Sequence, residues 1–472
     1  MKQSAECCPD VQSLLFGDIF QKPVSLEMGP EPQSGNAGLL LYGALDRGTK
    51  LTERAAHSVR EWRCAGKVQH QILELVRQRV YGLLAGYADG NDAAKLRHEP
   101  TFRLLLERAL DDDKDALASQ PTLSRFENGL ARGSLMRWGW TLVRWVLEQR
   151  RRRGGKVRRV TLDLDPTDDA AHGQQQFSFF NGHYDHRCFL PLLAFATFHG
   201  KHNQEEPERH LLAGLLRPGN ANAMLGAVSL LERLVRAVRE SFPQAKVRVR
   251  LDGAYATPEM LEYLEEEHLE YVINLGKNSV LEAKAETYML EARKRAVLSG
   301  QTERVFGEFE YTAGSWQGRA RRVVLKAEVT VDPAAPGKGL RDNPRFVVTN
   351  LRSSPEHVYR EVYCPRGSAE QGIEELKNGL YLGRTSCTDF LANQARVLLA
   401  VTAYILAQEL RARAQGTAAE RWQVGSLRTR LVKIAALVRE STRRWVFRVS
   451  RRAPDAVLLW MLARRLGAVP SG

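Results

Sequence analysis

Between residues 157 and 275, runs typical of β-strands are interleaved with runs typical of amphipathic helices. Alternating apolar and polar residues predict half-buried strands, and apolar residues at helical spacing predict helices. The predicted strands are residues 157–165, 176–180, 189–198, 247–252 and 271–275, and the predicted helices are residues 224–238 and 258–268. This order predicts an α/β architecture in which helices flank a mixed sheet.

Two of the predicted strands end in aspartate. Asp252 comes directly before Gly253, and the first strand carries both Asp163 and Asp165. Residues i and i+2 of a strand face the same side, so either Asp163 or Asp165 could share a site with Asp252. Strand-end aspartates also cap turns, and the nearby Asp168 and Asp169 could have only that role.

A third acidic residue is predicted to lie on a helix late in the chain. Glu370, Ile373, Glu374 and Lys377 share one helical face. The apolar Ile373 indicates that this face points at least partly into the protein. Glu370 and Glu374 repel each other at one turn's distance, a cost of a few tenths of a kcal/mol. A bound divalent cation would remove this repulsion, and solvation would ease it.

The residues around this helix resemble a transposase signature. Tyr363, Arg366, Glu370 and Lys377 have the spacing Y-(2)-R-(3)-E-(6)-K. This spacing is similar to the signature of bacterial DDE transposases of the insertion-sequence-four superfamily. Residues 86–100 and 115–128 look most like the insertion-sequence family thirteen-eighty.

The resemblance implies a ribonuclease-H-like fold in which Asp165, Asp252 and Glu370 are catalytic and bind metal. Asp165 is preferred to Asp163 because Asp165-Pro166-Thr167 has the Asp-x-Thr form common in the superfamily. The implied cofactor is Mg²⁺, for which Mn²⁺ can substitute. Carboxylate oxygens suit Mg²⁺, and two such ions about 3.5–4 Å apart activate a nucleophile and stabilise a leaving oxygen.

The same resemblance gives roles to the residues around Glu370. Tyr363, Arg366 and Lys377 would hold phosphates beside the cut. The implied reaction is cleavage at transposon ends followed by strand transfer, by a homodimer or larger assembly. A host nuclease of the same fold and a DNA-binding protein without catalysis are the alternatives.

Residues 277–352 are predicted to form a β-rich insertion, with strands over residues 305–312, 321–331 and 345–349. Related transposases with such an insertion can use one of its aromatic residues to stack a flipped base. Trp316 is the only tryptophan in this segment and is therefore the candidate. A tryptophan in a β-meander also commonly belongs to the core.

Residues 51–150 show helical periodicity and are predicted to bind DNA. Residues 115–128 read as a short helix ending near Ser119, a turn, and a second helix, which is the order of a helix-turn-helix. In that case Thr122, Ser124 and Arg125 would lie at the start of a recognition helix. A helical hairpin that only packs against its neighbours would look the same.

The formal net charge of +14 indicates a polyanionic partner. The longest apolar runs are shorter than the roughly 18 residues of a membrane span, so double-stranded DNA, at transposon ends and target, is expected rather than a membrane. The six cysteines include no C-x-x-C pair and are expected to be reduced. No signal peptide is evident, so we expect a cytoplasmic, nucleoid-associated protein.

These observations divide the chain into six parts. They are a loosely ordered N-terminus (1–50), a helical DNA-binding domain (51–150), the first part of the catalytic core (157–276), the β-rich insertion (277–352), the second part of the core with the Glu370 helix (353–412) and a basic helical C-terminal region (413–472).

Overall fold

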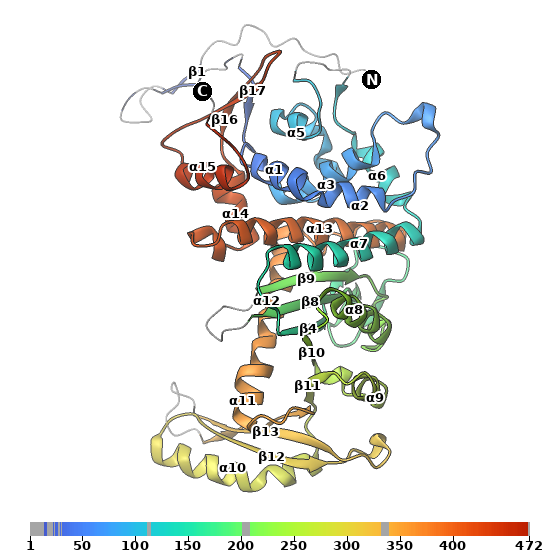
Figure 1. Cartoon of the computed structure of the whole chain (residues 1–472), viewed down its shortest axis with the longest axis vertical. Coiled ribbons are helices and arrows are strands. Elements are labelled where there is room, and N and C mark those ends of the chain that lie inside the picture. Colours follow the sequence, from blue (N-terminus) through green and yellow to red (C-terminus); the bar gives the residue numbers. More distant parts are fainter. Residues whose placement is uncertain are drawn as a thin grey trace.

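The computed structural model describes residues 14–16, 22, 24–26, 29, 31–110, 115–200, 208–331 and 339–470. The molecule is elongated (Figure 1). A helical region that includes the C-terminal segment lies at one end, and two long helices come next. The large sheet follows, and its strands within residues 303–349 lie at the other end of the molecule.

One mixed sheet runs through the molecule in the order β12-β13-β15-β11-β10-β4-β8-β9, with β14 paired to β13. The strands are β4 (Arg159–Pro166), β8 (Leu192–His199), β9 (Glu208–Leu215), β10 (Lys246–Leu251), β11 (Glu270–Leu275), β12 (Glu303–Tyr311), β13 (Arg321–Thr330), β14 (Arg341–Asp342) and β15 (Arg345–Thr349). Strand β10 is parallel to both β4 and β11, whereas β8 is antiparallel to β4 and β9. The predicted mixed α/β architecture is confirmed.

The register of β4 and β10 determines where the first two predicted acids lie. Arg250 of β10 is directly opposite Asp163 of β4. Because these strands are parallel, their carboxyl ends share one edge of the sheet. Asp165 and Asp252 each lie two residues beyond that pair, so they project from the same edge.

Helices cover the sheet and explain why its strands are so apolar. They include α7 (Arg132–Arg152), α8 (Ala227–Ser241), α9 (Pro258–Glu266) and α13 (Phe390–Arg413). By length and composition α13 could cross a membrane, but 83% of its most apolar window is buried. It packs against β9, α7 and helices of the N-terminal region. A helix that is apolar all round is expected at such a position in a protein core.

The predicted strand at residues 176–180 lies outside the main sheet. Only β6 (Phe179–Asn181) forms there, and it joins β7 (His186–Phe189) and β5 (Asp169–Ala170) in a small separate sheet. The position beside β8 in the main sheet is taken by β9, which was not predicted.

The expectation of a loosely ordered N-terminus is wrong for its last part, while residues 1–13 lie outside the described residues. Helix α1 (Leu39–Thr49) is buried in the core, and its Asp46 accepts hydrogen bonds from Thr52, Arg77 and Tyr81. The backbone before it bonds to the C-terminal segment: Gly38 N–H donates to the carbonyl of Val432. A Cβ at Gly38 would lie 1.5 Å from the Leu431 carbonyl oxygen. Local composition cannot reveal such long-range contacts.

Residues 51–150 are helical, but the predicted helix-turn-helix is wrong in its first half. Residues 116–119 are not helical, and only α6 (Gln120–Asn128) forms within residues 115–128 as described. The reason lies at Ala118, whose N–H donates to the Gln78 side chain and whose carbonyl accepts from it, at 3.1 and 2.9 Å. These bonds replace helical ones.

Residues 277–352 contain the three predicted strands as β12, β13 and β15, which continue the central sheet beyond β11 rather than forming a sheet of their own. The segment also contains a helix that was not predicted, α10 (Ser279–Ser299). Its Asn278 cap and its run of Glu, Ala, Lys and Leu are typical of a helix.

The C-terminal region is basic but only partly helical, so that prediction is corrected. Strands β16 (Ala436–Glu440) and β17 (Trp445–Val449) form a hairpin that pairs with β3 (Gln33–Ser34). Helices α14 (Val424–Leu427) and α15 (Ala456–Arg465) lie on either side of it in the chain. Burial alternates along both strands, between buried and half-buried residues at the start of β16 and between half-buried and exposed residues in β17, which matches the period of a strand.

Candidate active site

Three acidic residues come from different elements to the same edge of the sheet. Asp165 lies near the end of β4, and Asp252 follows β10 and caps a short 3₁₀ turn through Gly253 N–H. Glu370 lies in α12 (Gly367–Glu374), which packs against β4. The sequence-predicted acids are therefore carried by neighbouring elements.

Asp163 and Asp165 have different surroundings, although they are two residues apart. Asp163 is 1% exposed, and the Arg250 guanidinium donates to both of its carboxylate oxygens at 2.7 Å. Asp165 is 7% exposed, and its one hydrogen bond among the described residues comes from Arg366, at 2.9 Å. Asp163 is thus saturated by a structural partner, whereas Asp165 keeps acceptor capacity.

Burial, together with the nearby carboxylates of Asp252, Glu370 and Asp163, raises the pKa of Asp165 to about 6 against the opposing charge of Arg366. Crowded carboxylates of this kind favour any additional cation, because each one disfavours the charge of the others.

Arg366 is the cation at the centre of this group. Its Nη2 donates to Asp165, and its Nη1 lies 3.4 Å from the Glu370 carboxylate. Burial opposes the charge of its guanidinium, but the carboxylates of Asp165, Asp252 and Glu370 raise its pKa nonetheless. One guanidinium therefore neutralises part of a three-acid cluster.

A continuous helical segment, which includes two π-helical turns, carries both Arg366 and Glu370. It runs from α11 (Pro355–His357) through η6 (Val358–Tyr363), η7 (Cys364–Arg366) and α12 to η8 (Glu375–Gly379). Single π-turns within helices are frequent at functional sites. Buried Ala369, Gly372, Ile373 and Leu376 hold it on the sheet. Glu370 and Glu374 are exposed, so the predicted face is buried only at Ile373 and partly at Lys377.

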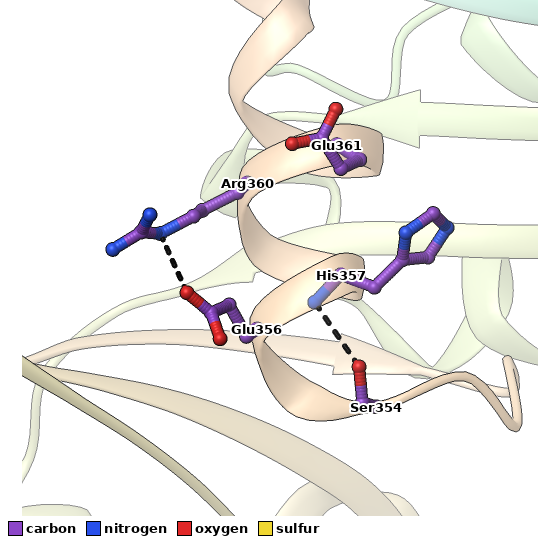
Figure 2. A pocket seen from close by; sticks show the side chains of 5 residues that line it. All are labelled: Ser354, Glu356, His357, Arg360 and Glu361. Carbon is purple, nitrogen blue, oxygen red and sulfur yellow. Dashed lines mark hydrogen bonds and ion pairs between the residues drawn. The ribbon is translucent and has the colours of Figure 1, made fainter. Parts of the chain in front are cut away.

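The start of this segment has a shallow cavity of about 270 Å³ (Figure 2), and Asp165, Asp252 and Glu370 are not among its lining residues. Its lining residues are Ser354, Glu356, His357, Arg360 and Glu361. Ser354 caps the helix by accepting from His357 N–H, and Arg360 pairs with Glu356 at 3.2 Å (Figure 2). These contacts stabilise the helix start.

Lys377 pairs with an acid outside the predicted triad. Its ammonium lies 2.7 Å from Asp168, which His186 also approaches at 3.3 Å. Burial alone would raise the pKa of Asp168, but Lys377 and His186 hold it below its ordinary value. Sequence reasoning gave Asp168 only a turn-capping role, and its position three residues after Asp165 was the available signal.

Tyr363 is half-buried, and its ring lies 5.6 Å from that of Tyr359. Burial raises the pKa of the Tyr363 phenol, and the charges of Asp252 and Glu370 act in the same direction against Arg366. Tyr363, Arg366 and Glu370 therefore share one electrostatic environment, whereas Lys377 lies beside Asp168.

The other predicted DNA contacts lie elsewhere. Trp316 is 3% exposed, packed edge-on against Tyr311 with the Arg321 guanidinium 5.0 Å from its ring centre, so this tryptophan is a core residue and not an open stacking platform. On α6, Arg125 is exposed, and Thr122 and Ser124 are partly exposed. Arg125 donates to the Thr122 hydroxyl at 3.4 Å.

The acids fit a hard divalent cation by their chemistry, because Asp165, Asp252 and Glu370 offer only carboxylate oxygens. Within the described residues, no three His, Cys, Asp or Glu side chains are gathered closely enough to hold an ion. Arg366 lies between Asp165 and Glu370.

Comparison with known proteins places the chain in a family. Residues 16–471 match the family described as Transposase DDE domain group 1. This match covers nearly the whole chain, so the chain belongs to the DDE transposase family, as its signature predicted. A comparison with curated proteins found no match. The chain is also similar to a solved structure, the cryo-EM structure of piggyBac transposase synaptic complex with hairpin DNA, with 9% identity, a TM-score of 0.40 and coverage of 84% of this chain and 80% of that chain.

Proposed function

We propose that this DDE transposase binds the terminal inverted repeats of an insertion sequence and catalyses metal-dependent cleavage and strand transfer at those ends. The proposal includes the insertion-sequence-four superfamily and, within it, the family thirteen-eighty. The observation that carries it is that Asp165, Asp252 and Glu370 come from neighbouring elements to one edge of the sheet, where Arg366 contacts both Asp165 and Glu370. The strand order β9-β8-β4-β10-β11, with its parallel pairs around β10, supports the ribonuclease-H-like assignment.

In this proposal Asp165, Asp252 and Glu370 would hold Mg²⁺, or Mn²⁺ in its place. When bound, the metal activates the attacking water or 3′-hydroxyl and stabilises the leaving oxygen. The bidentate pair of Asp163 with Arg250 holds β4 and β10 in register beneath the site. This rigid base keeps Asp165 and Asp252 at a fixed spacing.

The cations beside the acids act on the DNA backbone. Arg366 and Lys377 exchange their carboxylate partners, Asp165 and Asp168, for phosphate oxygens when DNA enters. Tyr363 lies in the same environment and positions the phosphate nearest Asp252. The substrate is double-stranded DNA, bound by a homodimer or larger assembly in the nucleoid of the cytoplasm.

The direct test is cleavage of a duplex that carries the inverted repeats flanking the gene. We expect Mg²⁺-dependent cleavage at the repeat ends, lost in Asp252→Asn and Glu370→Gln while DNA binding remains. Glu374→Gln is the matched control, because Glu374 is exposed one turn from Glu370. Full cleavage by Glu370→Gln, or equal loss in Glu374→Gln, would contradict the assignment.

End recognition is assigned to residues 51–150, with α6 as the element that meets base edges. The exposed Arg125, together with Thr122 and Ser124, supports this. Arg125→Ala should weaken the preference for repeat over random duplex, measured at one stated salt concentration. An unchanged preference would leave α6 with a packing role only.

A further inference from the structure

The C-terminal hairpin, residues 436–452, forms an arginine-rich projection from the helical region (Figure 1). It contains Arg439, Arg443, Arg444, Arg448, Arg451 and Arg452 against one acid, Glu440. All six arginines are exposed. We call residues 436–452 the arginine hairpin.

The inner face of the arginine hairpin fixes it to the helical region. Val438 N–H donates to the Pro32 carbonyl at 2.9 Å, and the Glu440 carboxylate accepts from Leu110 N–H at 2.9 Å. Ala436 and Val438 are buried on this face. The hairpin's one acid, although exposed, is therefore engaged in a bond to the backbone of the helical region.

The outer face and the tip carry the positive charge. Arg439 is opposite Val446, and Arg448 is opposite Leu437, so both arginines project from the face away from Val438. Arg443 and Arg444 lie in the tip, which the Ser441 N–H bond to the Arg444 carbonyl closes at 3.0 Å. The charges thus sit on a structured ribbon rather than on a loose tail.

Most of these arginines have no acidic partner among the described residues. Arg439 approaches Glu31 at 3.8 Å, but in the part of the chain that is described the other five make no ion pair or side-chain hydrogen bond. By contrast, Arg430, just before the hairpin, pairs with Asp455 at 2.8 Å. Concentrated, unneutralised guanidinium groups repel one another, a cost that a polyanion would remove.

We propose that the arginine hairpin binds the phosphate backbone of duplex DNA, independently of sequence, as a second contact beside the helical region. This proposal rests on the proposed function for the identity of the DNA. A two-stranded ribbon fits along a DNA groove, and guanidinium groups match phosphate oxygens in bidentate geometry. Because its base is tied to Leu110 and Pro32, the hairpin moves with the helices assigned to end recognition.

The test is a salt series of duplex binding by the full chain, with repeat and random DNA. The variant is Arg443→Gln/Arg444→Gln/Arg448→Gln. The control is Arg293→Gln/Arg295→Gln/Arg319→Gln, which removes the same charge from arginines that are ion-paired to acids. A third variant, Arg443→Lys/Arg444→Lys/Arg448→Lys, retains the charge.

We expect the slope of log K against log salt to fall by about 2 to 3 in the Gln variant on both duplexes, since each lost phosphate contact removes about 0.9. The control and the Lys variant should keep a slope near that of the wild type. An unchanged slope in the Gln variant, or an equal fall in the control, overturns the proposal. So does a loss of binding to phosphatidylserine vesicles with DNA binding intact.

The experiment separates this proposal from the proposed function. If the chain is not an end-cleaving transposase, wild-type protein fails to cleave repeat DNA, yet the slope difference on random duplex can still be measured. If only the hairpin proposal is wrong, wild-type cleavage is normal and the slopes coincide.

Discussion

The edge of the sheet formed by the carboxyl ends of β4 and β10 and the arginine hairpin are both rich in charged residues, but they differ in whether their cations are paired with acids. At the sheet edge each cation has an acidic partner: Arg250 with Asp163, Arg366 with Asp165, and Lys377 with Asp168. On the hairpin most guanidinium groups have none within the described residues. Paired charges at the edge fix geometry for chemistry, whereas unpaired charges on the hairpin are available for a polyanion.

Metal removal should have the largest effect and should separate the two regions. EDTA is expected to abolish cleavage of repeat-flanked DNA, because Asp165, Asp252 and Glu370 hold the metal in the proposed mechanism. The salt dependence of binding to random duplex should not change, since the hairpin uses no metal. Gel-based cleavage and fluorescence anisotropy on the same sample measure both. Cleavage that persists in EDTA would contradict the proposal that the acids at the sheet edge form a metal-dependent active site.

Lys377→Ala tests whether Lys377, which pairs with Asp168, also contacts the DNA backbone during cleavage. We expect cleavage to fall by about 100-fold, the loss typical of one lost electrostatic contact to a reacting group. Its pair with Asp168 is partly exposed, with side chains 33% and 25% accessible. Thermal stability should therefore fall by at most about 1 kcal/mol.

Lys377→Arg should rescue cleavage only in part, because a planar fork replaces a point charge. A large drop in melting temperature with unchanged single-turnover cleavage would mean that Lys377 is purely structural.

Arg366→Gln should have a smaller effect, which raises the affinity for metal and lowers DNA cleavage. Without the guanidinium at 2.9 Å from Asp165, DNA-free protein should bind Mn²⁺ about tenfold more tightly, equivalent to about 1.4 kcal/mol. Cleavage should decrease because a phosphate contact is lost. Calorimetric titration with Mn²⁺ measures the first effect, and equal affinity in both proteins would show that Arg366 does not compete with the cation.

His210→Gln should leave DNA binding and cleavage unchanged and affect stability alone. Burial, with Arg153 and Arg150 nearby, lowers the pKa of His210 to about 3. Between pH 6.5 and 3 the unfolded chain therefore binds a proton that the folded chain does not, and stability falls as pH falls. The contribution lost at pH 5 is about 2 kcal/mol. His210→Gln should flatten the decline in melting temperature below pH 6.5, while exposed His183→Gln should leave it unchanged.

The sequence was sufficient where a local pattern carries the information. Alternation predicted the strands β4 and β10 that carry Asp163, Asp165 and Asp252, whereas the choice of Asp165 and of Glu370 came from the resemblance to the transposase signature and stays a prediction. It was insufficient where a distant partner decides the structure. Residues 116–119 do not form the predicted helix, because the Gln78 side chain hydrogen-bonds to the backbone of Ala118.

The partners of charged residues were the least predictable part of the site. Lys377 pairs with Asp168, 209 positions earlier, and Asp163 pairs with Arg250, 87 positions later. These pairs depend on strand register and on how the helix lies on the sheet, and neither follows from spacing along the chain.

Whether Asp165 rather than Asp163 begins the catalytic triad is tested most directly by Asp163→Asn and Asp165→Asn, compared for melting temperature and single-turnover cleavage. Asp163→Asn should cost about 3–5 kcal/mol of stability, because it leaves the buried Arg250 guanidinium unpaired. Asp165→Asn should melt at or above the wild-type temperature, since a crowded carboxylate is removed, and should not cleave. A stable Asp163→Asn protein without cleavage, together with an Asp165→Asn protein that cleaves normally, would contradict this and make Asp163 the metal ligand.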